Sequence, residues 1–339
     1  MNNITKLGVS ALCGSLAAVS AANAGEMTVT GGADMSWTSF DGPTTGNPIG
    51  IGSNLTFNGS GELDNGWGVA LSTALTNANA TSNTNVVITI PSLGAIRIDQ
   101  GLSGTGIDRI DDVTPNVWEE AYGTGLSTGI DTVAGASGGS GIEFTPSIGL
   151  PEGLTAVLHW SPDADGSNAN DKGSSGVNTG AMGAGYDVTL TATDAVHGMT
   201  GLTVYGGMSS INQDDTVANY SGDKDEWTVA ANYAMGNFTI GYQISEEDLG
   251  KSAGAQKYEN EGFGITFAVN DDLSIGYNFY ESEQTNTTNQ TAEASSIQVA
   301  YSMGGASVRL ASAEIDNANY STNVGKDQKA TTLSVALAF

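Results

Sequence analysis

The sequence is poor in the residues on which several classes of protein depend. Its one cysteine, Cys13, falls within the first 24 residues, so the remainder has no thiol for a disulfide framework or a thiolate metal site. No stretch after residue 24 approaches the roughly 18 consecutive apolar residues of a membrane-spanning helix. Charged residues make up 14% of the chain, against about 25% in typical soluble domains. These shortages exclude a disulfide-stapled domain and a helical membrane protein.

The charge that is present is mostly of one sign. Lysine and arginine together number 10, whereas aspartate and glutamate number 37, which gives a formal net charge of −27. Such acidity argues against nucleic acid as a partner, because its phosphates would be repelled. The 47 glycines are about twice the average share. Few charges, much glycine and many Ser, Thr and Asn residues together favour an all-β protein.

Residues 1–24 are expected to be a signal peptide and not part of the fold. Lys6 precedes the apolar run Leu7–Val19, which is too short to span a bilayer as a helix, and Ala22-Asn23-Ala24 offers small residues for cleavage. Removing this segment, whose only charge is Lys6, leaves a formal net charge of −28. We therefore expect one exported domain over residues 25–339.

The last nine residues, Thr331–Phe339, alternate between two faces. Leu333, Val335, Leu337 and Phe339 fall on one side, and small or polar residues fall on the other. Nine residues suit a tilted transmembrane strand of about 9–11 residues. A terminal strand leaves an unpaired edge, which the first strand near Met27–Trp37 would close into a barrel. A final strand of this kind resembles the closing strand and assembly signal of outer-membrane β-barrels.

Between these ends, period-two patterns predict roughly 16 strands in all. Short turns such as Asp64-Asn65-Gly66 and Met235-Gly236-Asn237 alternate with longer polar loops, and an even strand number places both termini on the side of the short turns. The expected strand interiors carry no charge on their apolar face, as a wall in lipid requires. Eight titratable residues fall on the opposite face: Asp34, Glu62, Arg97, Asp99, Glu143, His159, Asp187 and Arg309.

Three segments carry a resemblance to a known family. Residues 59–68 (Gly-Ser-Gly-Glu-Leu-Asp-Asn-Gly-Trp-Gly) resemble the second hairpin of Gram-negative general porins. Residues 93–101 (Leu-Gly-Ala-Ile-Arg-Ile-Asp-Gln-Gly) resemble the segment before the constriction loop of those porins, and residues 139–160 resemble their following hairpin. Two departures are Pro91, which interrupts a short turn, and a fourth strand, Val86–Ile90, that is expected to be unusually short.

The resemblance implies an all-β fold, a transmembrane antiparallel β-barrel of about 16 strands with a long constriction loop after strand 5. It implies a protein of the cell outer membrane that forms a water-filled channel. Small hydrophilic solutes and ions would diffuse passively through this channel. A homotrimer in contact with outer-membrane lipid and lipopolysaccharide is part of the same implication. Composition and periodicity alone do not show the trimer.

Residues 102–139 form the longest expected loop, and a loop of this length is usually functional. By resemblance it folds into the lumen, where its charged residues would form the constriction: Asp108, Arg109, Asp111, Asp112, Glu119 and Glu120. The expected pore-wall residues are Asp34, Glu62, Arg97, Asp99 and Arg309. We expect the loop carboxylates to face Arg97 and Arg309 across the pore, and the excess of acid to favour cations.

Several alternatives stay open at this stage. A soluble β-sandwich, as a secreted or surface-exposed structural protein or adhesin without channel activity, would also have one apolar face per strand. The long loop would then lie on the outside with its charges solvated. No enzymatic activity is expected, because the two histidines, His159 and His197, fall in no HExxH or recognisable Ser-His-Asp pattern. No cofactor is expected, although the acidic loops 163–171 and 214–225 are candidate calcium sites without an EF-hand pattern.

Overall fold

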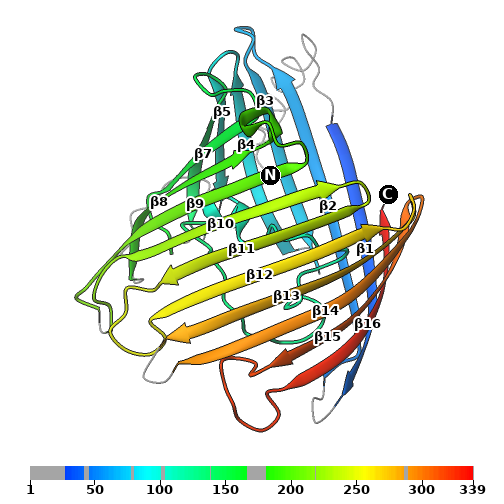
Figure 1. The fold of residues 1–339 in the computed structure, drawn as a ribbon. Helices are drawn as coiled ribbons and strands as arrows, with labels where there is room; N and C mark the ends of the chain where they lie inside the picture. The colour runs from blue at the N-terminus through cyan, green and yellow to red at the C-terminus, as the bar shows by residue number, and fades with distance from the viewer. Residues whose placement is uncertain are drawn as a thin grey trace, which may run out of the picture.

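Each strand of the protein pairs with its neighbours in the sequence, and together they close into one barrel (Figure 1). This computed structural model describes residues 27–41, 46–77, 80–100, 104–137, 139–165, 181–217, 219–285 and 289–338. Sixteen antiparallel strands lie within these ranges. They are β1 (Met27–Asp41), β2 (Ile49–Glu62), β3 (Gly68–Thr76), β4 (Ala80–Ile90), β5 (Gly94–Gln100), β6 (Ser140–Pro146), β7 (Leu154–Ser161), β8 (Met182–Ala192), β9 (Leu202–Gln213), β10 (Lys224–Met235), β11 (Phe238–Asp248), β12 (Lys257–Ala268), β13 (Leu273–Thr285), β14 (Gln290–Met303), β15 (Ala306–Asp316) and β16 (Gln328–Ala338).

The closure predicted for the last strand is confirmed. β16 pairs with β1 in the register Trp37↔Leu333 and Met35↔Val335, so the apolar residues of the two strands share one face. β16 also pairs with β15, which leaves neither edge of β16 free. The expected signal peptide, residues 1–24, and the expected assembly residue Phe339 lie outside the described residues.

The two ends of the barrel differ in most of their connections, although short turns and long loops do not alternate as strictly as the sequence predicts. At one end, called the turn end, strands are joined by tight connections, among them Asp64-Asn65-Gly66, where Gly66 adopts a φ of 81°. Such a positive φ costs glycine least, which explains the Asn-Gly pair there. At the other end, called the loop end, most connections are longer. The exceptions are residues 77–79 and 286–289 at the loop end, which are short, and residues 193–201 at the turn end, which are long. Met27, where β1 begins, and Ala338, where β16 ends, both lie at the turn end.

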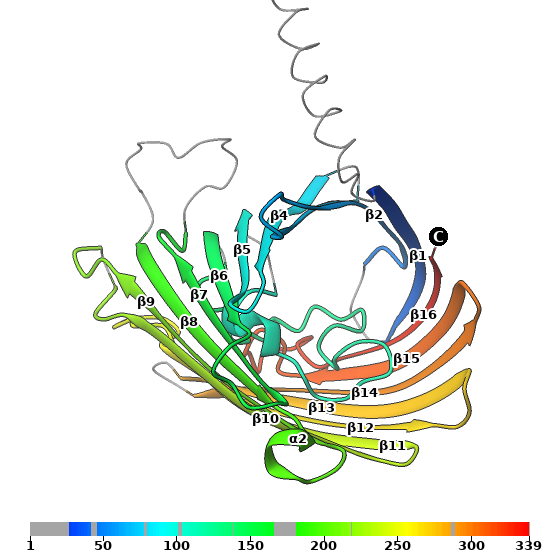
Figure 2. The same cartoon turned by 90° about the horizontal axis from the view of Figure 1, so that it is seen from above.

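Side chains alternate between the outside and the lumen along each strand. On β13, Ile275 and Tyr277 face outward and are about 40% exposed, whereas Asn278 and Tyr280 face inward and are 3% exposed. The inward side chains are buried because part of the β5–β6 connection lies inside the barrel (Figure 2). The described residues include only two short helical segments, η1 (Gly106–Ile110) and α2 (Asp194–His197), and no helix long and apolar enough to cross a membrane.

Two expectations about the strands are wrong. β4 is not short, because it begins at Ala80 and pairs with β3 through a segment of Thr, Ser and Asn that has no apolar alternation to mark it. The expectation that no strand interior carries a charge on its outward face also fails. Strands β11–β15 continue past their apolar residues toward the loop end, and there they carry an outward acidic row: Glu246, Glu259, Glu261, Glu281, Glu283, Glu293 and Glu314.

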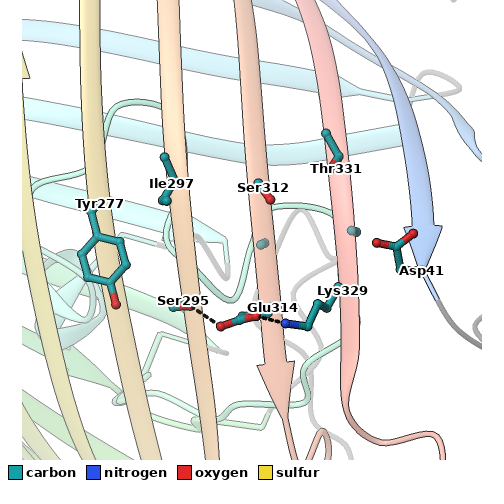
Figure 3. A pocket seen from close by; sticks show the side chains of 10 residues that line it. Asp41, Tyr277, Ser295, Ile297, Ser312, Glu314, Lys329 and Thr331 are labelled. Carbon is teal, nitrogen blue, oxygen red and sulfur yellow. Dashed lines mark hydrogen bonds and ion pairs between the residues drawn. The ribbon is translucent and has the colours of Figure 1, made fainter.

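Glu314, the last residue of the outward acidic row, has one polar and one basic neighbour near the strands that close the barrel. Figure 3 shows Glu314 on β15 between Ser295 on β14, which donates a hydrogen bond to it, and Lys329 on β16, with which it forms an ion pair. Tyr277 and Ile297 line the same shallow groove of about 350 Å³. The strands extend this far because ladder hydrogen bonds depend on the backbone, and an outward glutamate near the loop end reaches water.

Candidate functional site

Residues 104–137, called the inner loop, leave the end of β5 and run inside the barrel before the chain enters β6. The segment η1 begins the inner loop and packs against β8 and β9. Ile107 and Ile110 are 0% and 3% exposed and form a small apolar cluster with Val133, against which Tyr205 of β9 packs. The long loop expected between residues 102 and 139 therefore lies within the lumen where it is described.

Three carboxylates of the barrel wall hold the inner loop by its backbone. Glu143 on β6, Asp187 on β8 and Glu226 on β10 each accept backbone N–H groups from it. The distances are 2.6 Å for the shortest bond, from Gly135 to Glu226, and 3.4 Å for the longest. The other donors are Gly106, Ile107, Ala134 and Ala136. Charge-assisted bonds of this kind are stronger than neutral ones, so these carboxylates fix both legs of the loop.

Amide side chains hold the middle of the first leg. Gln243 on β11 donates to the carbonyls of Ile110 and Asp111 at 2.8 Å each, and its own oxygen accepts the N–H of Val113 at 3.0 Å. Gln298 on β14 accepts the N–H of Trp118 at 2.9 Å. Because an amide both donates and accepts, one side chain satisfies opposite backbone groups of an irregular segment.

Inward glycines mark the track of the loop across the wall. A Cβ added at Gly241 would lie 2.4 Å from Pro115, and one at Gly264 would lie 2.1 Å from the carbonyl oxygen of Pro115. A Cβ at Gly276 would lie 2.6 Å from Val117. The loop backbone can therefore press directly against β11–β13 only where the wall has no side chain.

Four of the predicted constriction residues gather into one carboxylate cluster. Asp111, Asp112, Glu119 and Glu120 interact with one another by side-chain hydrogen bonds and like-charge repulsion. Burial, followed by the neighbouring carboxylates, raises the pKa of Asp111 to about 8, and burial followed by the bond to Glu119 raises the pKa of Glu120 to about 9. The pKa values of Asp112 and Asp108 are also raised, mainly by burial. The cluster therefore shares protons near neutral pH.

Arg97 and Arg309, the wall arginines expected to face this cluster, pair with other carboxylates, and so does Arg109 of the inner loop. Arg97 on β5 lies 3.6 Å from Glu143, and Arg109 of the inner loop binds the same carboxylate. Arg309 on β15 pairs with Asp34 on β1, donates to the hydroxyl of Ser334 at 2.7 Å, and stacks 4.9 Å from the ring centre of Trp118. Each guanidinium thus has a carboxylate nearby, because few cations stand among many acids. Strand alternation gives the face of a residue but not its partner.

The remaining predicted wall residues face the lumen at different heights. Asp34 faces inward near the closure, and Glu62 faces inward where β2 reaches the turn end and is exposed. Asp99, at the end of β5, is buried with 2% exposure. The ribbon of the inner loop keeps to the side of β8–β16 and stays away from β2–β4 (Figure 2). Apart from Glu62, the inward positions of β2–β4 are uncharged residues such as Asn54, Ser72 and Asn85.

The functional residues that sequence reasoning missed are those that hold the loop: Glu226, Asn232, Gln243, Asn278 and Gln298. The sequence could have indicated these residues, since each is a carboxylate or an amide at a strand position whose parity places it in the lumen. His159 is fully buried and bonds Asp187 at 3.1 Å, which places it in the support of the loop. Among the described residues, no group of three or more His, Cys, Asp or Glu side chains is arranged to hold a metal ion. Calcium at the acidic loops stays a prediction.

Comparisons with known proteins agree with this architecture. A family model described as Gram-negative porin matches residues 8–323. Among solved structures, the chain is similar to an anion-selective porin from Comamonas acidovorans, with 14% identity, a TM-score of 0.65, and 93% of this chain and 100% of that chain covered. It is also similar to OmpF of Salmonella typhi in complex with daunomycin, with 14% identity, a TM-score of 0.69, and 93% and 98% covered. At these identities the structures show the fold alone. No curated protein matches the chain significantly.

Proposed function

The chain belongs to the Gram-negative porin family and forms an outer-membrane channel, and from this premise we propose that it conducts small hydrophilic solutes and ions by passive diffusion, with a preference for cations. No reaction and no energy coupling are part of this proposal. Sixteen-stranded barrels are wide enough to leave an aqueous channel when their lumen is not filled.

The observation that carries the proposal is the one-sided position of the inner loop. Wall carboxylates and amides hold it against β8–β16, while the inward residues of β2–β4, apart from Glu62 at the turn end, are Asn, Ser, Thr and other neutral or small types. A polar passage between the loop and β2–β4 would carry hydrated solutes and would disfavour apolar ones. In this proposal Asp108, Asp111, Asp112, Glu119 and Glu120 border the narrowest part of the passage.

Cation preference rests on the balance of charge at the inner loop. Its acidic residues outnumber its one arginine, and Arg97, Arg109 and Arg309 are each paired with a carboxylate. Unpaired negative charge enriches cations and depletes anions, more strongly at low salt because screening lengths are longer. One of the similar structures is an anion-selective porin, but at 14% identity its charges do not carry over to this chain.

We further propose a homotrimer that associates through the β2–β5 side. The outward positions of β2, β3 and β5 carry no Asp, Glu, Lys or Arg, whereas β11–β15 carry the outward acidic row. An uncharged apolar face suits subunit contact, and an acidic row at the loop end suits the headgroup region of lipid and lipopolysaccharide, with divalent cations such as calcium between the like charges. Light scattering of the detergent-purified protein tests this, and a monomer mass would contradict it.

The experiment that tests the channel is single-channel recording of the purified protein in planar bilayers. We expect steady ohmic current steps in KCl and a reversal potential of cationic sign in a KCl gradient. No conductance at high protein dose would contradict the channel and would favour the adhesin alternative. An anionic reversal potential would contradict the cation preference while leaving the channel in place.

A further inference from the structure

A cavity of about 550 Å³ lies beneath the inner loop, on the side of the turn end. The loop residues Asn116, Val117 and Trp118 form its roof, and inward residues of β11–β15 form its wall. The turn residues Asp271 and Asp272 stand at its rim. Its size falls within the roughly 300–1,000 Å³ of small-molecule sites.

The wall of the cavity is a patch of hydroxyl groups. They belong to Thr239, Thr266, Ser274, Ser302 and Ser307, one on each of the five neighbouring strands β11–β15, and they include the directly paired Thr239↔Thr266 and Ser302↔Ser307. Each hydroxyl can donate one hydrogen bond and accept others. Such a wall pairs with a ligand that also both donates and accepts along its length.

The roof supplies a fixed aromatic surface. The backbone N–H of Trp118 is bonded to Gln298 at 2.9 Å, and its ring packs against the guanidinium of Arg309 at 4.9 Å. The first contact fixes the backbone of Trp118, and the second holds its indole ring at the cavity. An indole offers a broad apolar surface together with one polar N–H, which suits the C–H face of a ring that carries hydroxyls at its edge.

The charges at the cavity disfavour an anion. Arg309, the cation of the lining, is already paired with Asp34 and bonded to Ser334. Asp271 and Asp272 add negative charge at the rim, and their carboxylates can accept hydrogen bonds from the hydroxyl groups of a neutral ligand. A neutral polyhydroxylated solute therefore fits the lining better than a carboxylate or a phosphate does.

We propose that this cavity is a weak binding site for a neutral mono- or disaccharide, entered from the turn end, which is the periplasmic end of the channel. The inference rests on the proposed channel function and goes beyond free diffusion, because a bound sugar would occupy the passage beneath the loop. The site is open to solvent, so the affinity is low, of about millimolar order.

The test is current block in planar bilayers by glucose and maltose, added separately to each side. We expect conductance to fall along a saturating curve, at lower sugar concentration from the periplasmic side than from the other side. Trp118→Ala should weaken the block roughly tenfold. The double variant S274A/S307A, which keeps the volume of the wall, should weaken it several-fold. Trp227→Ala, on the outward face of β10, is the matched control. Glucose and maltose should block this variant at the same concentrations as they block the parent.

Each other outcome has a defined meaning. A decrease in conductance that is linear in sugar concentration and equal in all variants would reflect solution viscosity alone. That result would overturn the proposed binding site. Block by glucosamine but not by glucose would identify a cation site and would also overturn the sugar proposal. A parent protein without any conductance would overturn the channel function instead, so the two failures are distinguishable.

Discussion

The hydroxyl of Thr332 on β16 donates a hydrogen bond to the backbone carbonyl of Thr124, 3.1 Å away, across 208 positions of sequence. The same hydroxyl lies 3.1 Å from that of Thr38 on β1. The middle of the inner loop, at Thr124, is therefore attached to β1 and β16, the two strands whose pairing closes the barrel. Closure of the barrel and placement of the loop are parts of one arrangement.

Thr332→Val should release the middle of the inner loop from β16. The variant keeps the shape of the side chain but leaves the buried carbonyl of Thr124 without its donor, at a cost of about 1–3 kcal/mol. We expect noisier single-channel current with an intact barrel. Thr331→Val, one residue earlier and outward, is the control and should give parental noise. Equal noise in all three proteins would contradict the anchoring role.

Gly264→Ala tests the direct contact between the loop and the wall. The added Cβ would lie 2.1 Å from the carbonyl oxygen of Pro115, so the loop must move away from β12. We expect an altered conductance and a weaker cation preference from a protein that still assembles. Gly52→Ala is the matched control, because a Cβ there meets nothing closer than 3.9 Å. Parental conductance in both variants would contradict the track assigned to the loop.

Cation preference should rise with pH. The pKa values of Asp111 and Glu120, about 8 and about 9, mean that the carboxylate cluster gains charge between roughly pH 7 and pH 10. Reversal potentials in a KCl gradient, measured across this range, should become more cationic. The double variant D111N/E120Q should flatten the curve. A parental curve from that variant would show that other groups set the pH dependence.

The same two groups predict the sign of the pH effect on stability. Their pKa values are higher in the fold than the ordinary values of 3.8 and 4.5, so the folded protein holds these protons more tightly. Their contribution to stability is therefore present at low pH and is lost as the pH rises from about 4 toward 8 and 9. Thermal unfolding in detergent should show a lower midpoint at pH 9 than at pH 6, with a smaller difference for D111N/E120Q.

Neutralising the loop acids together should lower the cation preference severalfold. The variant carries Asn or Gln at Asp108, Asp111, Asp112, Glu119 and Glu120. A matched control removes five charges from the outward acidic row, with Gln at Glu246, Glu259, Glu261, Glu281 and Glu283. Outward charges are separated from the passage by the barrel wall, so the control should keep the parental reversal potential. Equal effects from both variants would mean that net charge, and not the inner loop, sets selectivity.

Leu337→Asp tests the outward face of the closing strand. Leu337 faces outward on β16, opposite Ala33 of β1 and Ala306 of β15, and a carboxylate there costs up to a few kcal/mol depending on its depth in the bilayer. We expect a lower yield of heat-modifiable barrel. Ala338→Asp places the same group on the lumen side one residue later and should assemble normally. Normal yield from both variants would contradict the assignment of the outward face to lipid.

The sequence was sufficient for the barrel wall because alternation is a direct trace of the two environments. Met35 and Val335 share a face in the structure as period two requires, and the closure follows from that. The ends of the strands were less predictable. Glu259 and Glu261 belong to β12 although nothing apolar marks their positions, since backbone pairing does not need an apolar side chain.

The interior was predictable by side but not by partner. Parity places Arg97 and Arg309 in the lumen, yet it cannot say that Glu143 and Asp34 will take them. Those pairings depend on the register and tilt of strands far apart in sequence. The path of the loop left a readable mark in Gly241, Gly264 and Gly276, which are inward positions without side chains in otherwise regular strands.

The outward acidic row also bears on how the barrel sits in its membrane. On β13 the outward apolar residues run only from Leu273 to Phe279 before Glu281 begins, about 20 Å along the strand and less once the strand tilts. The apolar band of outer-membrane barrels is about 25 Å tall. This side of the protein is thus too short for an unperturbed bilayer, and the hydrophobic mismatch draws the headgroup layer inward against β11–β14. The channel would therefore be most stable in short-chain lipid.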